Sequence, residues 1–373
     1  MKKALIVLLA VAFVGAFALP AMAADKTEWS FYGDARVSTM VYDTDENAAN
    51  APNGPLFDDR DTMWHLQDGS RFGARASAGD ITGHVEIRES AEFRHIFGEW
   101  DWGIGKLGVG KTYTPVNMFY AGQAGFNGNG IVTTGVFTNA DGMIRLRFDE
   151  LPGPLDFITF ALVEPANLDE DGAGEDVPIL IGSDADNTLP QIEMDLVMKF
   201  GGLRLEMNGG WAEVEDTRIV GNAEREYDID AWQVAFGAMY SIGPFYANGL
   251  IHTGENVTQL GQFTWAPASN SAWYNAATDS IVDSDRWGFN LVAGFKVNEM
   301  FAMEAGYGQD EADTNAVGAF EDETSEWYVQ FPITPAKGVL IMPEIGELDY
   351  ENGVNNQDQG DEMYYGVYWK IAF

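Results

Sequence analysis

The sequence of 373 residues contains no cysteine, which excludes disulfides and thiolate metal sites. It is also poor in bases: 21 lysines and arginines stand against 58 acids, and the formal net charge is -37. So large a negative charge argues against a nucleic-acid partner, because the phosphates would be repelled. The few histidines are too dispersed for the ligand spacing of a metal cluster; they are His65, His84, His95 and His252.

The first 23 residues have the three-part layout of a cleavable secretory signal. Lys2 and Lys3 precede an apolar stretch at 4–19, and the small-residue site Ala21-Met22-Ala23 follows. An uncleaved membrane anchor is the alternative, but the stretch is short and ends at Pro20. We therefore expect a signal peptide at 1–23 and an exported mature chain at 24–373.

The mature chain lacks any run of 18 or more apolar residues, so we expect no membrane-spanning helix. The sequence is instead rich in strand and turn formers, with 13% aromatic residues and 42 glycines. A soluble all-β protein and a transmembrane barrel are the two remaining classes. Alternation of side chains decides between them, because a transmembrane strand needs about ten residues with one face towards lipid and the other towards the lumen.

The last segment alternates throughout, and one of its faces is formed by Tyr365, Val367, Trp369, Ile371 and Phe373. The other face carries Tyr364, Gly366, Tyr368, Lys370 and Ala372. The same period-two pattern along the chain predicts about sixteen strands, an even number as such barrels require. They are expected near 28–42, 62–78, 81–89, 92–102, 104–112, 142–149, 155–163, 190–200, 203–214, 229–241, 244–253, 285–297, 300–309, 324–333, 338–349 and 362–373.

The connections alternate in length, which is a second and independent signal. Short turns are expected near 79–80, 151–154, 201–202, 242–244, 298–299 and 334–337, and long loops near 43–61, 113–141, 164–189, 213–228, 254–284, 310–323 and 350–361. A soluble sandwich has no reason to sort its loops by side, whereas a barrel with tight periplasmic turns and long external loops does. We therefore predict an all-β fold, one closed antiparallel barrel at 24–373, because an open edge in lipid would leave backbone groups unpaired.

The layout resembles the general bacterial porin family, whose members are trimeric sixteen-stranded barrels of the Gram-negative outer membrane. The clearest match is the stretch 94–100, RHIFGEW, followed by 103–115, GIGKLGVGKTYTP. The terminal Phe373 with its alternating apolar neighbours is similar to the family's signal for the outer-membrane assembly machinery. The resemblance implies a water-filled channel, residence in the lipid bilayer, a homotrimer, and passive diffusion of ions and small hydrophilic solutes without a cofactor.

In that family the third external loop folds into the barrel and narrows it. The corresponding loop here is about 113–141, which is long and rich in glycine and small residues that could pack inside a lumen. Many relatives carry acids on this loop opposite an arginine cluster, but here Asp141 is its single acid. The sign of charge selectivity is therefore not carried over from the family.

Bases gather at inward-facing positions of the early strands. Arg145 and Arg147 alternate with apolar neighbours, and a charge on the lipid side would cost about 2 to 4 kcal/mol at the midplane. The predicted pore-lining residues are Arg71, Arg75, Arg88, Arg145, Arg147 and Asp141. One interpretation is a basic wall that sets a field across the constriction. The alternative is salt bridging to lumen acids such as Asp34, Glu86 or Glu193.

The long loops are rich in acids and hold a single base, Arg60, across 43–61, 164–189, 309–326 and 349–362. A solvated surface accounts for part of this pattern. The further hypothesis is an acidic outer vestibule that concentrates cations and weakens with salt. Asp169-Glu170-Asp171 with Glu175-Asp176 could hold Ca²⁺, although no EF-hand pattern is complete there. This would make the chain a calcium-binding or adhesive surface barrel, the alternative to a channel.

Two further motifs suggest enzymes and are set aside. Residues 105–112 read GKLGVGKT and match the phosphate-binding P-loop, but that loop must open a helix and this segment alternates as a strand. His84 could serve a serine in an outer-membrane phospholipase, yet no serine and histidine constellation stands out. We therefore expect a channel with no catalytic step.

Overall fold

The computed structural model describes residues 27–44, 59–125, 134–138, 140–149, 151–165, 183–186, 189–220, 223–262, 271–316, 319, 321–351, 353 and 358–373. The expected signal peptide at 1–23 lies outside these residues. The described residues form strands and one short 3-10 helix, η2 at Val257–Leu260. Within this part of the chain, no helix is long and apolar enough to cross a membrane.

The first half of the chain contributes β1 Glu28–Thr44, β2 Asp59–Leu66, β3 Arg71–Ala78, β4 Ile81–Arg88, β5 Phe93–Asp101, β6 Lys106–Tyr113, β7 Ala140–Asp149, β8 Leu155–Val163, β9 Ser183–Asp186 and β10 Gln191–Phe200. The second half contributes β11 Leu203–Val220, β12 Ala223–Ile242, β13 Phe245–Glu255, β14 Trp273–Asn275, β15 Ser280–Val282, β16 Ser284–Lys296, β17 Ala302–Thr314, β18 Asp322–Gln330, β19 Ile333–Ala336, β20 Val339–Asp349 and β21 Asp361–Ala372. β14 and β15 pair only with each other.

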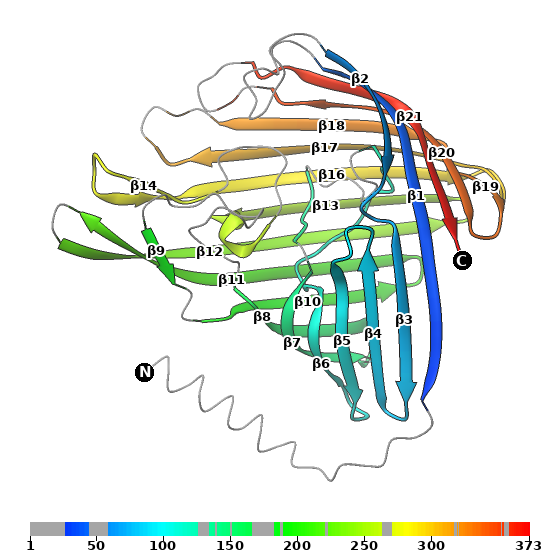
Figure 1. The fold of residues 1–373 in the computed structure, drawn as a ribbon, viewed down its shortest axis with the longest axis horizontal. Helices are drawn as coiled ribbons and strands as arrows, with labels where there is room; N and C mark the ends of the chain where they lie inside the picture. The colour runs from blue at the N-terminus through cyan, green and yellow to red at the C-terminus, as the bar shows by residue number, and fades with distance from the viewer. Residues whose placement is uncertain are drawn as a thin grey trace.

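The remaining strands close into an antiparallel barrel with sixteen strand positions around the ring, each of which we call a stave. Three staves are interrupted: β2 and β3 both pair with β1, β9 and β10 with β11, and β18 and β19 with β20. The ring closes where β1 pairs with β21, from Asp34 opposite Ala372 to Thr44 opposite Glu362. Figure 1 shows these two strands side by side, in blue and red. The predicted fold class is confirmed.

The prediction of a long loop near 213–228 is wrong. β11 and β12 remain paired from Leu203 opposite Tyr240 to Val220 opposite Ala223, so this connection is a long hairpin. Charged residues such as Glu213 disguised the strand, because this part of the hairpin carries polar side chains outwards instead of the apolar ones that a lipid-facing strand requires. On its inward side Val214 packs on Ile229 and Ala272, and the next buried residues, Asp216 and Arg218, form an ion pair.

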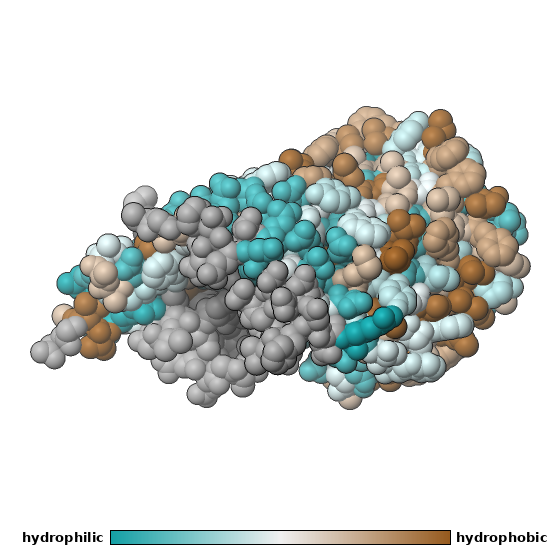
Figure 2. All heavy atoms as spheres, turned by 90° about the horizontal axis from the view of Figure 1, so that it is seen from above, coloured by the Kyte–Doolittle hydropathy of each residue, from teal (hydrophilic) through white to brown (hydrophobic). Residues whose placement is uncertain are grey.

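The two faces of the staves differ as the alternation predicts. Large apolar side chains such as Phe72, Ile144 and Leu291 are exposed on the outside, while Glu193, Gln233 and Asn290 are buried on the inside. Figure 2 shows apolar residues gathered over the half of the barrel with the short turns and hydrophilic residues towards the long loops. The outward face therefore suits hydrocarbon, and the polar groups collect in the lumen.

Candidate functional site

The start of the third long connection lies inside the barrel, against inward-facing side chains of the wall. The Val116 backbone N–H donates to Glu193 of β10 at 3.2 Å. The Tyr120 hydroxyl donates to Glu206 of β11 at 2.9 Å. Val116 and Tyr120 also belong to a buried apolar cluster, so this stretch is fixed by packing as well as by hydrogen bonds.

Carboxylates of three later strands hold the next residues of the connection. The Gly122 N–H donates to Glu304 of β17 at 2.9 Å. The N–H groups of Ala124 and Gly125 donate to the two oxygens of Glu344 on β20, at 2.8 and 2.7 Å. The Gln123 side chain donates to Glu326 of β18. A connection with almost no acids of its own is thus held by acids of the barrel wall.

The returning part of the connection, 134–138, is held from both sides. The Asn117 amide donates to the Thr138 hydroxyl at 2.7 Å, and the Thr138 N–H donates back to Asn117 at 2.8 Å. Arg286 of β16 donates to the Gly135 carbonyl at 3.3 Å while its Nε donates to Asp310 at 2.8 Å. A buried ion pair therefore anchors this segment to β16 and β17.

One wall glycine gives the connection room. A Cβ atom on Gly237 of β12 would lie 2.2 Å from the Tyr120 ring, which is far inside van der Waals contact. Any larger residue at this position would push against the tyrosine that Glu206 holds. The bare strand surface at Gly237 thus sets how closely the connection approaches the wall.

The predicted arginines lie on the opposite side of the lumen, on β3, β4 and β7. Arg71 lies 3.2 Å from Asp34 and 3.5 Å from Glu86. Arg145 donates to Glu99 at 3.1 Å, and Arg147 donates to Asp149 at 2.6 Å. The sequence interpretation of inward-facing bases therefore matches their register, because Arg145 and Arg147 oppose Gly108 and Lys106 across the ladder.

The other predicted residues have different surroundings. Arg75 stacks over the Tyr32 ring at 5.0 Å and has no ion pair with the described residues. Arg88 lies opposite Arg71 on the neighbouring strand. Asp141 lies opposite Thr112, at the loop end of β7.

The salt-bridge alternative describes part of the wall. Asp34 and Glu86 do pair with Arg71, but Glu193 accepts the Val116 N–H and belongs to the connection.

Several cations near these arginines were not among the predicted residues. Arg94 donates to Glu86 and to the Tyr113 hydroxyl, Lys106 lies 2.8 Å from Asp149, and Arg36 lies 2.5 Å from Asp34. Lys106 could have been predicted as an inward-facing residue from the alternation of its strand. Arg94 was not, because the ladder between β4 and β5 shifts register beside it, and simple alternation fails at such a bulge.

A cavity of about 620 Å³ opens between these strands towards the turn end of the lumen. Its lining includes four cations, Arg75, Lys106, Arg145 and Arg147, and two acids, Glu28 and Glu99. The lumen here is thus basic, although the protein as a whole is strongly acidic.

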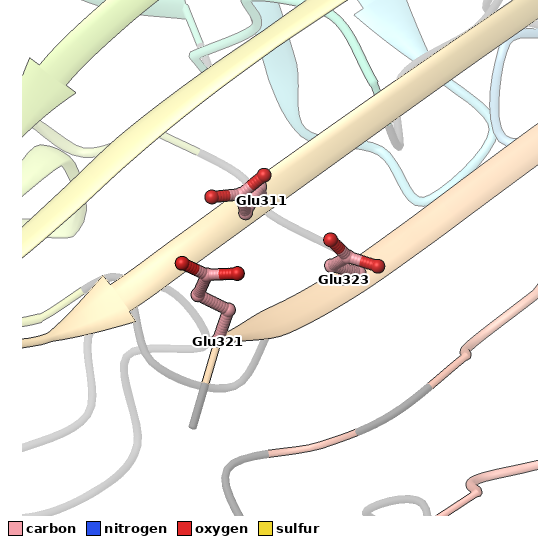
Figure 3. A group of neighbouring side chains, drawn as sticks. All are labelled: Glu311, Glu321 and Glu323. Carbon is pink, nitrogen blue, oxygen red and sulfur yellow. The ribbon is translucent and has the colours of Figure 1, made fainter. Parts of the chain in front are cut away.

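Three carboxylates of the acidic region near 309–326 lie together. One oxygen from each of Glu311 on β17, Glu323 on β18 and the preceding Glu321 lies within 4.8 Å of the others. Figure 3 shows these three side chains close together. They are not strongly buried, and exposed acids often cluster without a bound cation. The calcium ligands suggested at 169–176 lie outside the described residues.

The enzyme-like motifs have ordinary structural roles. The P-loop match at 105–112 lies almost wholly in β6, Lys106–Tyr113, and opens no helix. The His84 ring lies within hydrogen-bond distance of the Tyr32 hydroxyl, which is its side-chain partner among the described residues.

A closed ring of staves with an apolar outside, a polar lumen and a chain segment held within it defines a channel of the outer-membrane porin class. The chain belongs to the Gram-negative porin family, whose sequence profile matches residues 9–353. It is a porin for passive diffusion across the outer membrane.

Solved structures of similar fold are porins and channels. The outer-membrane channel DcaP of Acinetobacter baumannii is 13% identical with a TM-score of 0.70, over 93% of this chain and 97% of that one. An anion-selective porin from Comamonas acidovorans is 13% identical with a TM-score of 0.58, over 93% and 100%. The trimer form of OmpT from Vibrio cholerae is 15% identical with a TM-score of 0.59, over 94% and 100%. No curated protein sequence matches this chain.

Proposed function

We propose that the basic side of the lumen, on β3 to β7, sets the charge selectivity of this porin and favours small anionic solutes. The observation that carries the proposal is the cavity lined by Arg75, Lys106, Arg145 and Arg147 against only two acids. In a narrow passage with low-dielectric walls, a surplus of one charge raises the local concentration of the opposite ion. Transport needs no chemical step and no cofactor.

The facing side of the lumen supports this asymmetry. Its glutamates at 304, 326 and 344 are buried, and their oxygens accept hydrogen bonds from residues 122–125. The connection therefore covers these carboxylates, while Arg75 is exposed to the lumen and Arg147 is partly exposed. A solute in the passage meets more uncovered positive charge than negative charge on these strands.

The test is the reversal potential in planar bilayers under a KCl gradient. We expect Arg145→Ala with Arg147→Ala to lower the anion-to-cation permeability ratio severalfold, because two of the four cavity cations are lost. Arg225→Ala is the control, since Arg225 pairs with Asp279 at the loop end of β12. An unchanged ratio in the double variant would demote these arginines to scaffolding. Absence of any conductance in the wild type would favour an adhesive or structural barrel.

We also propose that three copies associate through the outside of β3 to β6. Small residues Ala74, Ala76, Gly83 and Gly98 make this face flat, and they line a shallow hollow beside Val85. OmpT of Vibrio cholerae, which has the same fold, is described in a trimer form. Native mass measurement in detergent should give three chains, and Ala76→Arg should give one. A monomeric wild type would refute the proposal.

A further inference from the structure

We infer that the lumen contains a binding site for small aromatic carboxylates, formed where a series of contacting aromatic rings meets the basic cavity. This inference rests on the proposed anion preference and specifies the solute class. Two observations carry it: a continuous series of ring contacts along the basic side of the lumen, and arginine guanidinium groups lying over the rings of that series.

The aromatic series begins at the loop end and runs towards the turn end. Phe119 lies 5.1 Å from Tyr113, measured between ring centroids, and Tyr113 lies 5.4 Å from His95. His95 lies 5.2 Å from His84, and His84 lies 5.4 Å from Phe97. Phe119 belongs to the third connection and is 45% exposed, so the series starts on an accessible ring. Its last members, His84 and Phe97, line the basic cavity.

Arginines lie over the rings of this series at successive levels. Arg94 lies 4.6 Å from the Tyr113 centroid, and Arg145 lies 4.9 Å from the Phe97 centroid. A guanidinium has two faces, so an arginine stacked on a protein ring can offer its other face to a second ring. Its edge presents N–H donors that match a carboxylate. Each pair of an arginine and an aromatic ring can thus offer a ligand both a stacking surface and a positive charge.

The cavity has the size and polarity of a small-molecule site. Its volume of about 620 Å³ lies within the range of roughly 300 to 1,000 Å³ that is common for ligand pockets. The Phe97 ring lies beside the Arg145 guanidinium, and Arg75 lies two strands from Phe97, on β3, without an acid partner among the described residues. The hydroxyls of Ser77 and Thr82 also line it and could complete the solvation of a carboxylate.

These groups select a combination of features. An aliphatic acid of equal size would gain the arginines but not the stacking on ring or guanidinium faces. A neutral aromatic molecule would gain the stacking but not the charge-assisted hydrogen bonds. A benzoate-like solute gains both, and we expect it to occupy the cavity while it passes.

The experiment measures block of the chloride current through the full-length channel in planar bilayers at neutral pH. Benzoate and cyclohexanecarboxylate are the probes, because they have the same charge and nearly the same size and differ in the aromatic ring. In the wild type we expect the half-blocking concentration of benzoate to be about threefold lower, as one ring contact is worth. Equal half-blocking concentrations would overturn the inference.

Phe97→Leu tests the position of the site, because it removes the ring and keeps an apolar side chain. We expect the two probes to become equivalent, because the ring that distinguishes them is lost. Phe289→Leu is the matched control on the outside of β16 and should retain the wild-type difference. Retention of the difference in Phe97→Leu would place the selectivity elsewhere and refute the site. The two proposals fail separately, because an unchanged permeability ratio in the double arginine variant would refute the anion selectivity, whereas equal half-blocking concentrations in the wild type would refute this site.

Discussion

At the scale of single residues, this porin holds the chain segment in its lumen with carboxylates of the wall. The buried Glu304 and Glu344 accept backbone N–H groups that would otherwise lack partners after removal from water, and Glu326 accepts the side-chain amide of Gln123. Glu344 accepts the N–H groups of both Ala124 and Gly125, and it also accepts the Tyr364 hydroxyl at 2.8 Å. The position of the segment therefore depends on a few specific acids and not on its own charge.

The first prediction concerns Glu344→Gln. An amide retains a single acceptor oxygen, so at least one of the Ala124 and Gly125 N–H groups loses its partner, at a cost of about 1 to 3 kcal/mol. We expect a larger and noisier single-channel current, because the segment is less firmly held. Glu347→Gln on the outward side of the same strand is the control and should behave as the wild type. A quiet channel of unchanged conductance in Glu344→Gln would show that these bonds do not fix the passage.

The second prediction concerns Gly237→Val. Its Cβ would overlap the Tyr120 ring, so the ring must leave Glu206 and the connection must shift into the lumen. We expect the conductance to fall. Adding Tyr120→Ala removes the obstacle and should restore the conductance. If the double variant stays as narrow as the single one, contact with Tyr120 is not the cause.

Sequence alternation could predict which residues face the lumen but not which of them meet. Arg71 and Arg145 lie at inward positions because period two follows from strand geometry, and their role in the passage stays a prediction. The partner of Arg145, Glu99, lies two strands away across the sheet, and that pairing depends on register. The glutamates beneath the connection were not identified as its anchors, because nothing in a strand pattern shows which loop will cover an inward acid.

At the scale of elements, the strands were predictable where lipid imposes alternation and less so beyond it. The hairpin of β11 and β12 continues to Val220 and Ala223, where outward positions such as Glu213 and Glu215 carry charges instead of the apolar residues that face lipid. The broken stave of β2 and β3 was read as one strand, since the interruption around Ser70 keeps the same faces inward. Strand existence follows from periodicity, whereas strand ends depend on what surrounds each face.

The third prediction concerns the seam between β1 and β21. The backbones of Gly33 and Phe373 exchange two hydrogen bonds of 2.9 Å, and the Phe373 ring covers Gly33. We expect Phe373→Ala to reduce the fraction of chain that migrates as a folded barrel on unheated gels, because the closing pair loses packing. Met363→Ala, at an outward position of the same strand, is the control. If Phe373→Ala and the wild type gave equal folded fractions, Phe373 would be needed neither for barrel closure nor for recognition by the assembly machinery.

At the scale of the whole molecule, charge is separated between surface and lumen. The chain carries a net charge of -37, yet the cavity near Arg75 and Arg145 is basic. The acid-rich stretches at 45–58 and 166–182 lie outside the described residues, so the outer vestibule stays a prediction. Ion selectivity is then the sum of an acidic approach and a basic passage.

The fourth prediction uses salt to separate these contributions. The screening length falls from about 10 Å at 0.1 M to about 3 Å at 1 M salt, so charges at a wide mouth are screened before charges within a narrow passage. We expect the anion preference to increase between low and moderate KCl, as the acidic approach is screened first, and to decline again towards 1 M. The anion preference is measured from the reversal potential at each salt level, with the ratio of the two KCl concentrations held constant. A monotonic loss of anion preference from the lowest salt would contradict an acidic vestibule.

The hydrogen bonds between Gly33 and Phe373 bring the last strand back to the first at the turn end of the ring. Neither strand can satisfy its outer edge until the other has arrived, so no intermediate made in chain order is self-sufficient in lipid. Once the barrel has closed, however, its hydrogen bonding does not depend on which strand was synthesised first. A circular permutant that joined these neighbouring ends and placed the new termini at the tight turn of Gly243 would therefore form the same barrel.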